Sequence, residues 1–184
     1  MKSIVTRRLP GRVADLLSGL GASPRLVAHL TVVHDVAYQL TQAIDRLWPE
    51  VVYDHQAVLV GAATHDIGKV NYPGELSGPG NQHEGAGAAL LTEHDFPEVV
   101  ARLARTHGGW AALPAPPLEA LLVALADTAW RGERNHRLEE MVAEHLAWAS
   151  GDEPWSVLVS FSDTVEAIAE GAEARLAWQA MHPV

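Results

Sequence analysis

Apolar residues recur at intervals of three and four positions along most of the chain, which is the period of an amphipathic α-helix. The clearest case follows Ser23-Pro24, where serine can cap a helix and proline suits the first helical position. Its apolar stripe consists of Leu26, Leu30, Val33, Ala37, Leu40, Ile44 and Leu47. Pro49 then ends the pattern. We find no convincing strand pattern and no internal repeat, so the sequence predicts an all-α fold.

The rest of the chain divides into helical segments in the same way. Asp54 can cap the second long segment, and residues 118–126 are apolar on almost every side, which predicts a central, buried helix. The expected helices other than 24–48 are 13–20, 54–66, 82–93, 97–107, 118–126, 135–150 and 154–181. We expect one helical domain over residues 1–184, with a motif-bearing core at about 23–134 and C-terminal helices at about 135–181.

Two features follow the predicted helix at 54–66: a loop and a helix with one thin side. Residues 71–81 are rich in proline and glycine, and loops of this length in compact domains often serve as lids or binding segments. The helix that follows is thin on one side, because residues 85–89 are all glycine or alanine. A neighbouring backbone could therefore approach it closely.

Composition narrows the class of protein. The chain has 184 residues, 48% of them hydrophobic, which is enough for a substantial core. It has no cysteine, so any metal site must use histidine and carboxylate ligands. A net charge of −10 disfavours nucleic acid as a partner. No signal peptide or membrane-spanning run is evident, and we expect a cytoplasmic protein without a membrane partner. Its oligomeric state is open, with a homodimer as one option.

Metal-capable side chains stand on faces that are otherwise apolar. They are His29, His65, Asp66, His83, His107 and Asp127. For each histidine taken singly, the alternative is a core imidazole that bonds to a backbone carbonyl. For Asp127 the alternative is a buried salt bridge to Arg131, four residues later. Since these residues occur about once per helix on successive helices, a bundle whose inner faces meet would bring them together.

The sequence contains three His-Asp dipeptides, and only the pair at 65–66 continues an apolar stripe. By helical phase, His34-Asp35 lies on the polar side of its helix with Tyr38, Thr41 and Asp45, so we assign it to a solvated face. The third pair, His94-Asp95, precedes Phe96-Pro97 and is typical of a helix C-terminal turn.

The set resembles the HD-domain metal-dependent phosphohydrolases, which carry a His on one helix, a His-Asp pair on the next and a distant Asp. The matching pieces are His29 with Val33 and Ala37, His65-Asp66 within HDIGK, and Asp127 within ALAD. His83 and His107 are similar to the additional ligands of binuclear members, in which Asp66 would bridge the two ions. The resemblance implies one or two divalent ions of Fe, Mn, Co, Ni or Zn.

Two departures from relatives bear on the substrate. Some binuclear members have a His-His pair where this chain has His107 followed by Gly108. The Gly-Tyr-Pro loop of the cyclic-di-nucleotide phosphodiesterases is also missing, which disfavours that substrate class.

The resemblance and the chemistry of the ligands together suggest hydrolysis of a small phosphorylated substrate, a nucleotide or dinucleoside polyphosphate, by metal-bound hydroxide. Lys69, Arg131 and Arg134 are candidate cations for the phosphates, and each could instead be a plain surface charge. Glu84 is a candidate proton shuttle, or an exposed acid of a first helical turn. Two other functions stay open. One is a di-iron oxygenase on the same scaffold, and the other is a non-catalytic nucleotide sensor.

Overall fold

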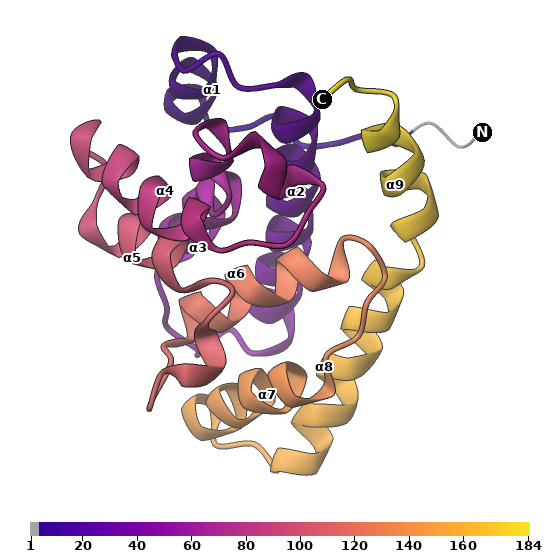
Figure 1. Cartoon of the computed structure of the whole chain (residues 1–184). Helices are drawn as coiled ribbons and strands as arrows, with labels where there is room; N and C mark the ends of the chain where they lie inside the picture. The colour runs from indigo at the N-terminus through magenta and orange to yellow at the C-terminus, as the bar shows by residue number, and fades with distance from the viewer. Residues whose placement is uncertain (1–3) are drawn as a thin grey trace.

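The computed structural model describes residues 4–184, which form α-helices and short 3-10 turns with no strand among them (Figure 1). The α-helices are α1 Gly11–Gly19, α2 Pro24–Leu47, α3 His55–Thr64, α4 Gln82–Glu93, α5 Glu98–Thr106, α6 Leu118–Ala129, α7 His136–Ser150, α8 Pro154–Ala169 and α9 Ala172–Ala180. The 3-10 turns are η1 Ile67–Val70, η2 Pro73–Leu76 and η3 Trp110–Ala112. The all-α prediction is therefore confirmed.

Local capping explains where α2 and α3 begin. The Ser23 side chain accepts a hydrogen bond from the Leu26 amide at the start of α2, directly before Pro24. Asp54 does the same for Ala57 at the start of α3, at 2.9 Å. Both starts agree with the sequence expectation. None of the helices over residues 4–184 combines the length and apolar character needed to cross a bilayer.

The core is divided between two groups of buried side chains. The larger group joins α2, α3, α6, α7 and α8 and includes Leu103 of α5, and the smaller one joins α1, α2, α3, α4 and α5. Helix α6 runs through the middle of the molecule, as Figure 1 shows, and most of its residues are buried. The apolar run at 118–126 was expected to do this. Helices α2 and α3 contribute to both groups, so they hold the two halves of the core together.

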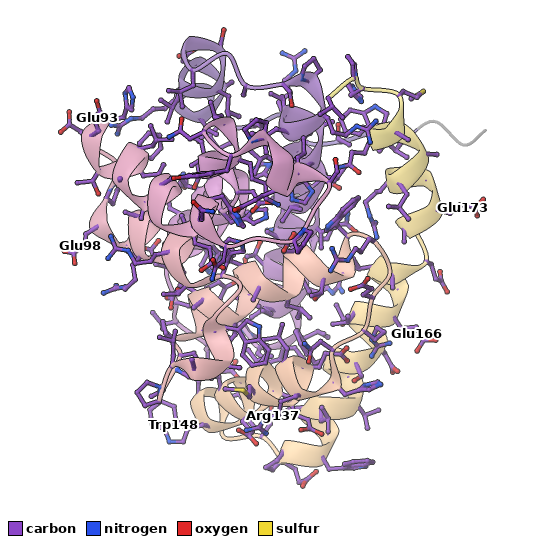
Figure 2. All side chains as sticks on the ribbon, in the orientation of Figure 1. Glu93, Glu98, Arg137, Trp148, Glu166 and Glu173 are labelled. Carbon is purple, nitrogen blue, oxygen red and sulfur yellow. The ribbon has the colours of Figure 1, made fainter. Side chains whose placement is uncertain are left out.

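Charged side chains occupy the outside of the bundle. Figure 2 labels Glu93, Glu98, Glu166 and Glu173, which are all exposed and project from four different helices. Acidic groups thus surround the molecule on several sides rather than forming one patch, in keeping with the net charge of −10.

The prediction of one continuous helix at 154–181 is wrong, because the helix is interrupted at Glu170-Gly171 and forms α8 and α9 instead. The buried side chain of Arg175 explains the break. Its guanidinium donates to the carbonyl of Ile168 at 2.7 Å and to that of Trp130 at 2.7 Å. A Cβ at position 171 would lie 2.6 Å from the same guanidinium. Arg175 therefore needs glycine at this turn, and it joins the ends of α8 and α6.

The assignment of His34 to a solvated face of α2 is also wrong. His34 and Thr41 are 3% and 1% exposed, because α8 and α9 pack on this side of α2. The N-terminal segment adds cover, since the Arg7 amide donates to Asp35 and its guanidinium lies 3.5 Å from the centre of the Tyr38 ring. Burial and the nearby Arg7 charge lower the pKa of His34 to about 4, so the imidazole is neutral at pH 7.

The turn η1 lies directly against the start of α4. A Cβ on Gly68 would be 2.0 Å from the carbonyl oxygen of His83 and 2.5 Å from the Gly87 nitrogen. Both neighbours are backbone atoms, so neither can move aside alone. This is the close backbone approach that the thin side of α4 predicts. The contact fixes the His65-Asp66 segment relative to His83.

We therefore expect Gly68→Ala to be strongly destabilising. The added methyl group must separate η1 from α4, and the free energy of unfolding should fall by about 3 kcal/mol. Gly85→Ala is the matched control on the same helix, because a Cβ there meets nothing within 4 Å. This control should raise the stability by about 0.5–1 kcal/mol through helix propensity. Urea denaturation of both variants measures the difference, and equal stabilities would contradict the packing argument.

Candidate metal centre

Five helices bring the six candidate ligands together. His29 lies on α2, His65 follows α3, His83 belongs to the first turn of α4, and His107 follows α5. Asp66 is next to His65, and Asp127 is near the end of α6. We call these six residues the histidine–aspartate cluster. All are buried except Asp127, whose side chain is 25% exposed.

Asp66 lies at the centre of the cluster, and its two oxygen atoms face different histidines. The Oδ2 atom is 3.1 Å from His29 Nε2 and 3.5 Å from His65 Nε2. The Oδ1 atom is 3.0 Å from His83 Nε2 and 3.4 Å from His107 Nε2. One carboxylate thus serves two pairs of imidazoles, one pair at each of its oxygen atoms.

Asp127 completes the group of atoms on the Oδ2 side. Its Oδ1 atom is 3.2 Å from His65 Nε2 and 3.5 Å from His29 Nε2. The alternative salt bridge to Arg131 is not formed, because Arg131 pairs with Glu133 at 2.8 Å. The carboxylate in the apolar helix α6 is therefore stabilised by the histidines of α2 and α3.

Hydrogen bonds to Nδ1 orient two of the imidazoles. His65 Nδ1 lies 2.9 Å from the carbonyl oxygen of Ala62, and His107 Nδ1 lies 2.9 Å from that of Ala104. Each carbonyl belongs to the last turn of the preceding helix, where carbonyl groups lack partners within the helix. When the ring is neutral, a proton on Nδ1 leaves the Nε2 lone pair free to coordinate a metal ion.

The charges of the cluster shift its pKa values strongly. Burial alone would raise the pKa of Asp66, but the His65 charge and the nearby rings of His107, His29 and His83 hold it well below its usual range. The opposite balance acts on His65: burial lowers its pKa, whereas Asp66 and Asp127 together raise it to about 9. The carboxylates of Asp66 and Asp127 thus need positive charge close by.

The donor atoms fit a divalent transition metal. Asp66 Oδ1 and His83 Nε2 are both buried without a hydrogen-bond partner among the described residues, although they face each other. Three overlapping groups place their ligand atoms within 4.8 Å of one another: His29, His65 and Asp66; His65, His107 and Asp127; and Asp66, His83 and His107. Imidazole and carboxylate are the donors expected for Fe, Mn, Co, Ni or Zn.

Of the four other predicted site residues, Lys69 and Glu84 lie near the cluster. Lys69 Nζ is 2.5 Å from Asp66 Oδ2, so this lysine is not a plain surface charge. Glu84 is half-buried, and its carboxylate occupies space next to Gly108, where a Cβ would be 2.5 Å from Oε1. It therefore lies beside the residue that follows His107.

The two predicted arginines are placed differently. Arg131 is exposed and forms the ion pair with Glu133. Arg134 donates to both carboxylate oxygens of Glu139, at 2.8 and 2.5 Å. Because Glu139 is only 1% exposed, this pairing neutralises a buried charge within α7. The structure thus does not bring Arg134 into the cluster.

Sequence reasoning missed Glu75. Its Oε2 atom lies 2.5 Å from His83 Nδ1, in the position that backbone carbonyls take beside His65 and His107. Glu75 belongs to η2, within the loop at 71–81. A carboxylate in a loop rich in proline and glycine carries no periodic signal, and nothing in the sequence relates it to a histidine eight residues later.

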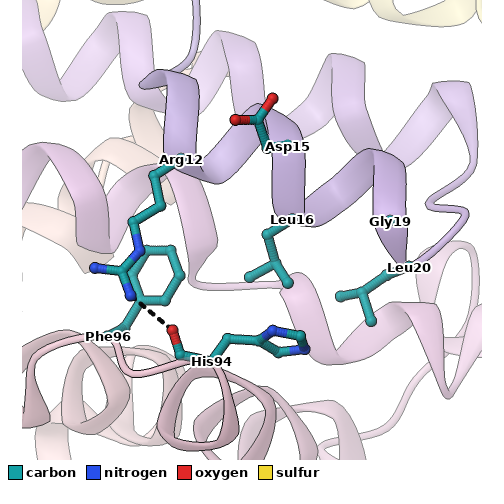
Figure 3. Close-up of a pocket in the computed structure, with 7 residues that line it drawn as sticks. All are labelled: Arg12, Asp15, Leu16, Gly19, Leu20, His94 and Phe96. Carbon is teal, nitrogen blue, oxygen red and sulfur yellow. Dashed lines mark hydrogen bonds between the residues drawn. The ribbon is translucent and has the colours of Figure 1, made fainter.

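A separate cavity of about 330 Å³ lies between α1 and the turn that joins α4 to α5 (Figure 3). In it the Arg12 guanidinium covers the Phe96 ring and donates to the His94 carbonyl at 2.7 Å. None of its lining residues belongs to the cluster.

The backbone of Asp95 adopts φ 57°, so His94-Asp95 does form the predicted C-terminal turn of α4.

Comparison with known families agrees with this arrangement, because residues 10–129 match the HD domain family. The chain belongs to the HD-domain family. The match covers the helices from α1 to α6, and it therefore includes every residue of the cluster.

Solved HD-domain structures share the fold. The HD domain of the L. monocytogenes phosphodiesterase PgpH is 18% identical, with a TM-score of 0.55 over 88% of this chain and 98% of that one. The same domain in complex with cyclic-di-AMP is 17% identical, with a TM-score of 0.55 over 88% and 96% of the two chains. At this level of identity the likeness concerns the fold, which extends beyond α6 into the C-terminal helices.

Metal analysis tests whether the two sides of Asp66 bind separate ions. We expect wild-type protein to bind about two divalent ions, and His83→Ala or His107→Ala about one, with helicity retained. Asp66→Ala should bind none, because its carboxylate serves both sides. His94→Ala is the control, since this histidine is exposed. A wild type that saturates at one ion, and a His83→Ala variant that holds it equally well, would contradict the two-ion prediction.

Proposed function

We propose that this HD-domain protein is a metal-dependent phosphohydrolase that acts on a small phosphorylated substrate, a nucleotide or dinucleoside polyphosphate. The observation that carries the proposal is the division of the buried Asp66 carboxylate between two pairs of imidazoles. When bound, divalent ions supply an activated water molecule and neutralise the charge of a phosphoryl group. Membership of the HD-domain family supports the same chemistry.

The protein's own residues would perform three tasks: metal binding, phosphate binding and proton transfer. The cluster would hold the ions, with the Asp66 carboxylate facing both histidine pairs. Lys69, whose Nζ atom lies 2.5 Å from Asp66 Oδ2, would bind a substrate phosphate beside the cluster. Glu84, next to Gly108, is the proposed proton shuttle towards the leaving group.

The two predicted arginines differ in how well they are placed to contact a substrate phosphate. Arg131 has a side chain that is 41% exposed, and it follows Asp127 by one helical turn, so it can reach a substrate that extends away from the ions. Arg134 would have to leave the buried Glu139 without its partner, which is costly. We therefore retain Arg131 as a candidate phosphate contact and assign Arg134 to the packing of α7.

The substrate class rests on size and charge. A surface with a net charge of −10 repels long polyanions, whereas a small anion needs only the local positive charge of Lys69 and the ions. The PgpH domain is a structural relative described in complex with cyclic-di-AMP, which is itself a small phosphorylated nucleotide. This supports the general class, although the missing Gly-Tyr-Pro loop leads us to expect linear nucleotides rather than cyclic ones.

Release of phosphate in the absence of oxygen tests the proposed reaction. Protein loaded with Mn²⁺, Co²⁺ or Fe²⁺ should release phosphate or a nucleotide product from a panel of nucleotides, dinucleoside polyphosphates and cyclic-di-AMP. Asp66→Ala should show only background release. Consumption of oxygen by the iron-loaded protein, without release from any phosphorylated compound, would instead indicate the oxygenase. Binding without turnover would indicate the sensor.

The role of Lys69 predicts a separate kinetic result. Lys69→Ala should lower kcat/KM by about 10–100-fold with its metal content intact, because one charge-assisted hydrogen bond to phosphate is lost. Arg137→Ala, which removes an exposed cation from α7, should leave the kinetics unchanged. If the two variants behave alike on the active substrate, Lys69 does not bind it.

A further inference from the structure

His83 differs from its partner His107 in the way its ring is held. His65 and His107 lie at helix C-termini, where a carbonyl three residues earlier is free to accept a hydrogen bond from Nδ1. His83 lies in the first turn of α4, and a helix N-terminus presents free amides rather than free carbonyls. An acceptor for its Nδ1 proton must therefore come from elsewhere in the chain.

Glu75 supplies that acceptor and also caps the helix. Its Oε2 atom lies 2.5 Å from His83 Nδ1 and 3.1 Å from the His83 amide nitrogen. Its Oε1 atom accepts from the Gln82 amide at 3.2 Å. One carboxylate thus satisfies two free amides at the start of α4 and one ring nitrogen. The favourable position of a negative charge at a helix N-terminus adds to these bonds.

The loop at 71–81 is shaped around this carboxylate. Gly80 adopts φ 157°, and a Cβ there would lie 2.4 Å from the carboxyl carbon of Glu75. Any larger residue at position 80 would push the carboxylate away from α4. The Glu75 side chain is 10% exposed, so water has little access to the hydrogen bonds that it makes. The loop and the ring of His83 are therefore held in place by the same group.

We propose that Glu75 is the positioning residue for the metal ion on the His83–His107 side of Asp66. By accepting a hydrogen bond from Nδ1, it leaves the Nε2 lone pair of His83 directed at Asp66 Oδ1, 3.0 Å away. It has no such contact with His29 or Asp127, so the ion on their side does not depend on it. The inference deepens the proposed function, because it concerns the same centre.

Calorimetric titration of metal-free protein with Mn²⁺ tests this selectivity. Glu75→Ala should weaken the binding of one of the two ions by about 10–100-fold and leave the other unchanged. Glu75→Gln keeps an acceptor for the Nδ1 proton and should restore most of the affinity. Glu93→Ala is the control, because it removes an exposed carboxylate from the other end of α4. If Glu75→Ala binds both ions with wild-type affinity, or weakens both equally, the inference is wrong.

A second measurement does not depend on metal. In metal-free wild type, the Nδ1 proton of His83 should give an exchange-protected, downfield proton NMR signal, identified by its absence from His83→Asn. The signal should be lost in Glu75→Ala and kept in Glu75→Gln, with circular dichroism showing that the helices are intact. Persistence of the signal in Glu75→Ala would overturn the inference. Wild type that binds no Mn²⁺ but shows the expected signals would refute the metal centre while supporting the contact.

Discussion

The burial of Asp66 is the constraint on which the rest of the structure depends. A carboxylate at 2% exposure is tolerated only when neighbouring groups compensate its charge. Four imidazoles from four helices provide that compensation, together with Lys69. The helices must therefore meet at one point, and the bundle has little freedom in how it packs around that point.

Packing between elements makes this meeting point rigid. Gly68 and Gly87 let η1 and α4 touch through their backbones, so the carboxylate and the His83 ring have a fixed spacing. The rings of His65 and His107 are tied to the helices that carry them. Preorganised donors lose little entropy when they bind an ion, which favours tight and selective coordination.

The sequence predicted all six members of the cluster because they interrupt apolar stripes, where a polar side chain needs a reason to be present. The same reasoning failed for His34, since helical phase shows which side of α2 is more polar but not what covers it. Its cover comes from α8 and α9, more than a hundred residues later. Glu75 and the break at Gly171 were missed for a related reason: both are set by a single long side chain that reaches another element, and such contacts have no period.

The hydrogen bonds of Arg175 affect where a truncated form of this protein can end. The family match ends at residue 129, at the last residue of α6, yet the carbonyls of residues 129 and 130 accept hydrogen bonds from a guanidinium on α9. Trp130 in turn packs edge-on against the ring of His29, with ring centres 5.1 Å apart. Packing around the matched segment thus continues beyond residue 129 into the C-terminal helices. A fragment cut at the family boundary would expose the end of α6 beside the first histidine, whereas one that keeps α9 would preserve it.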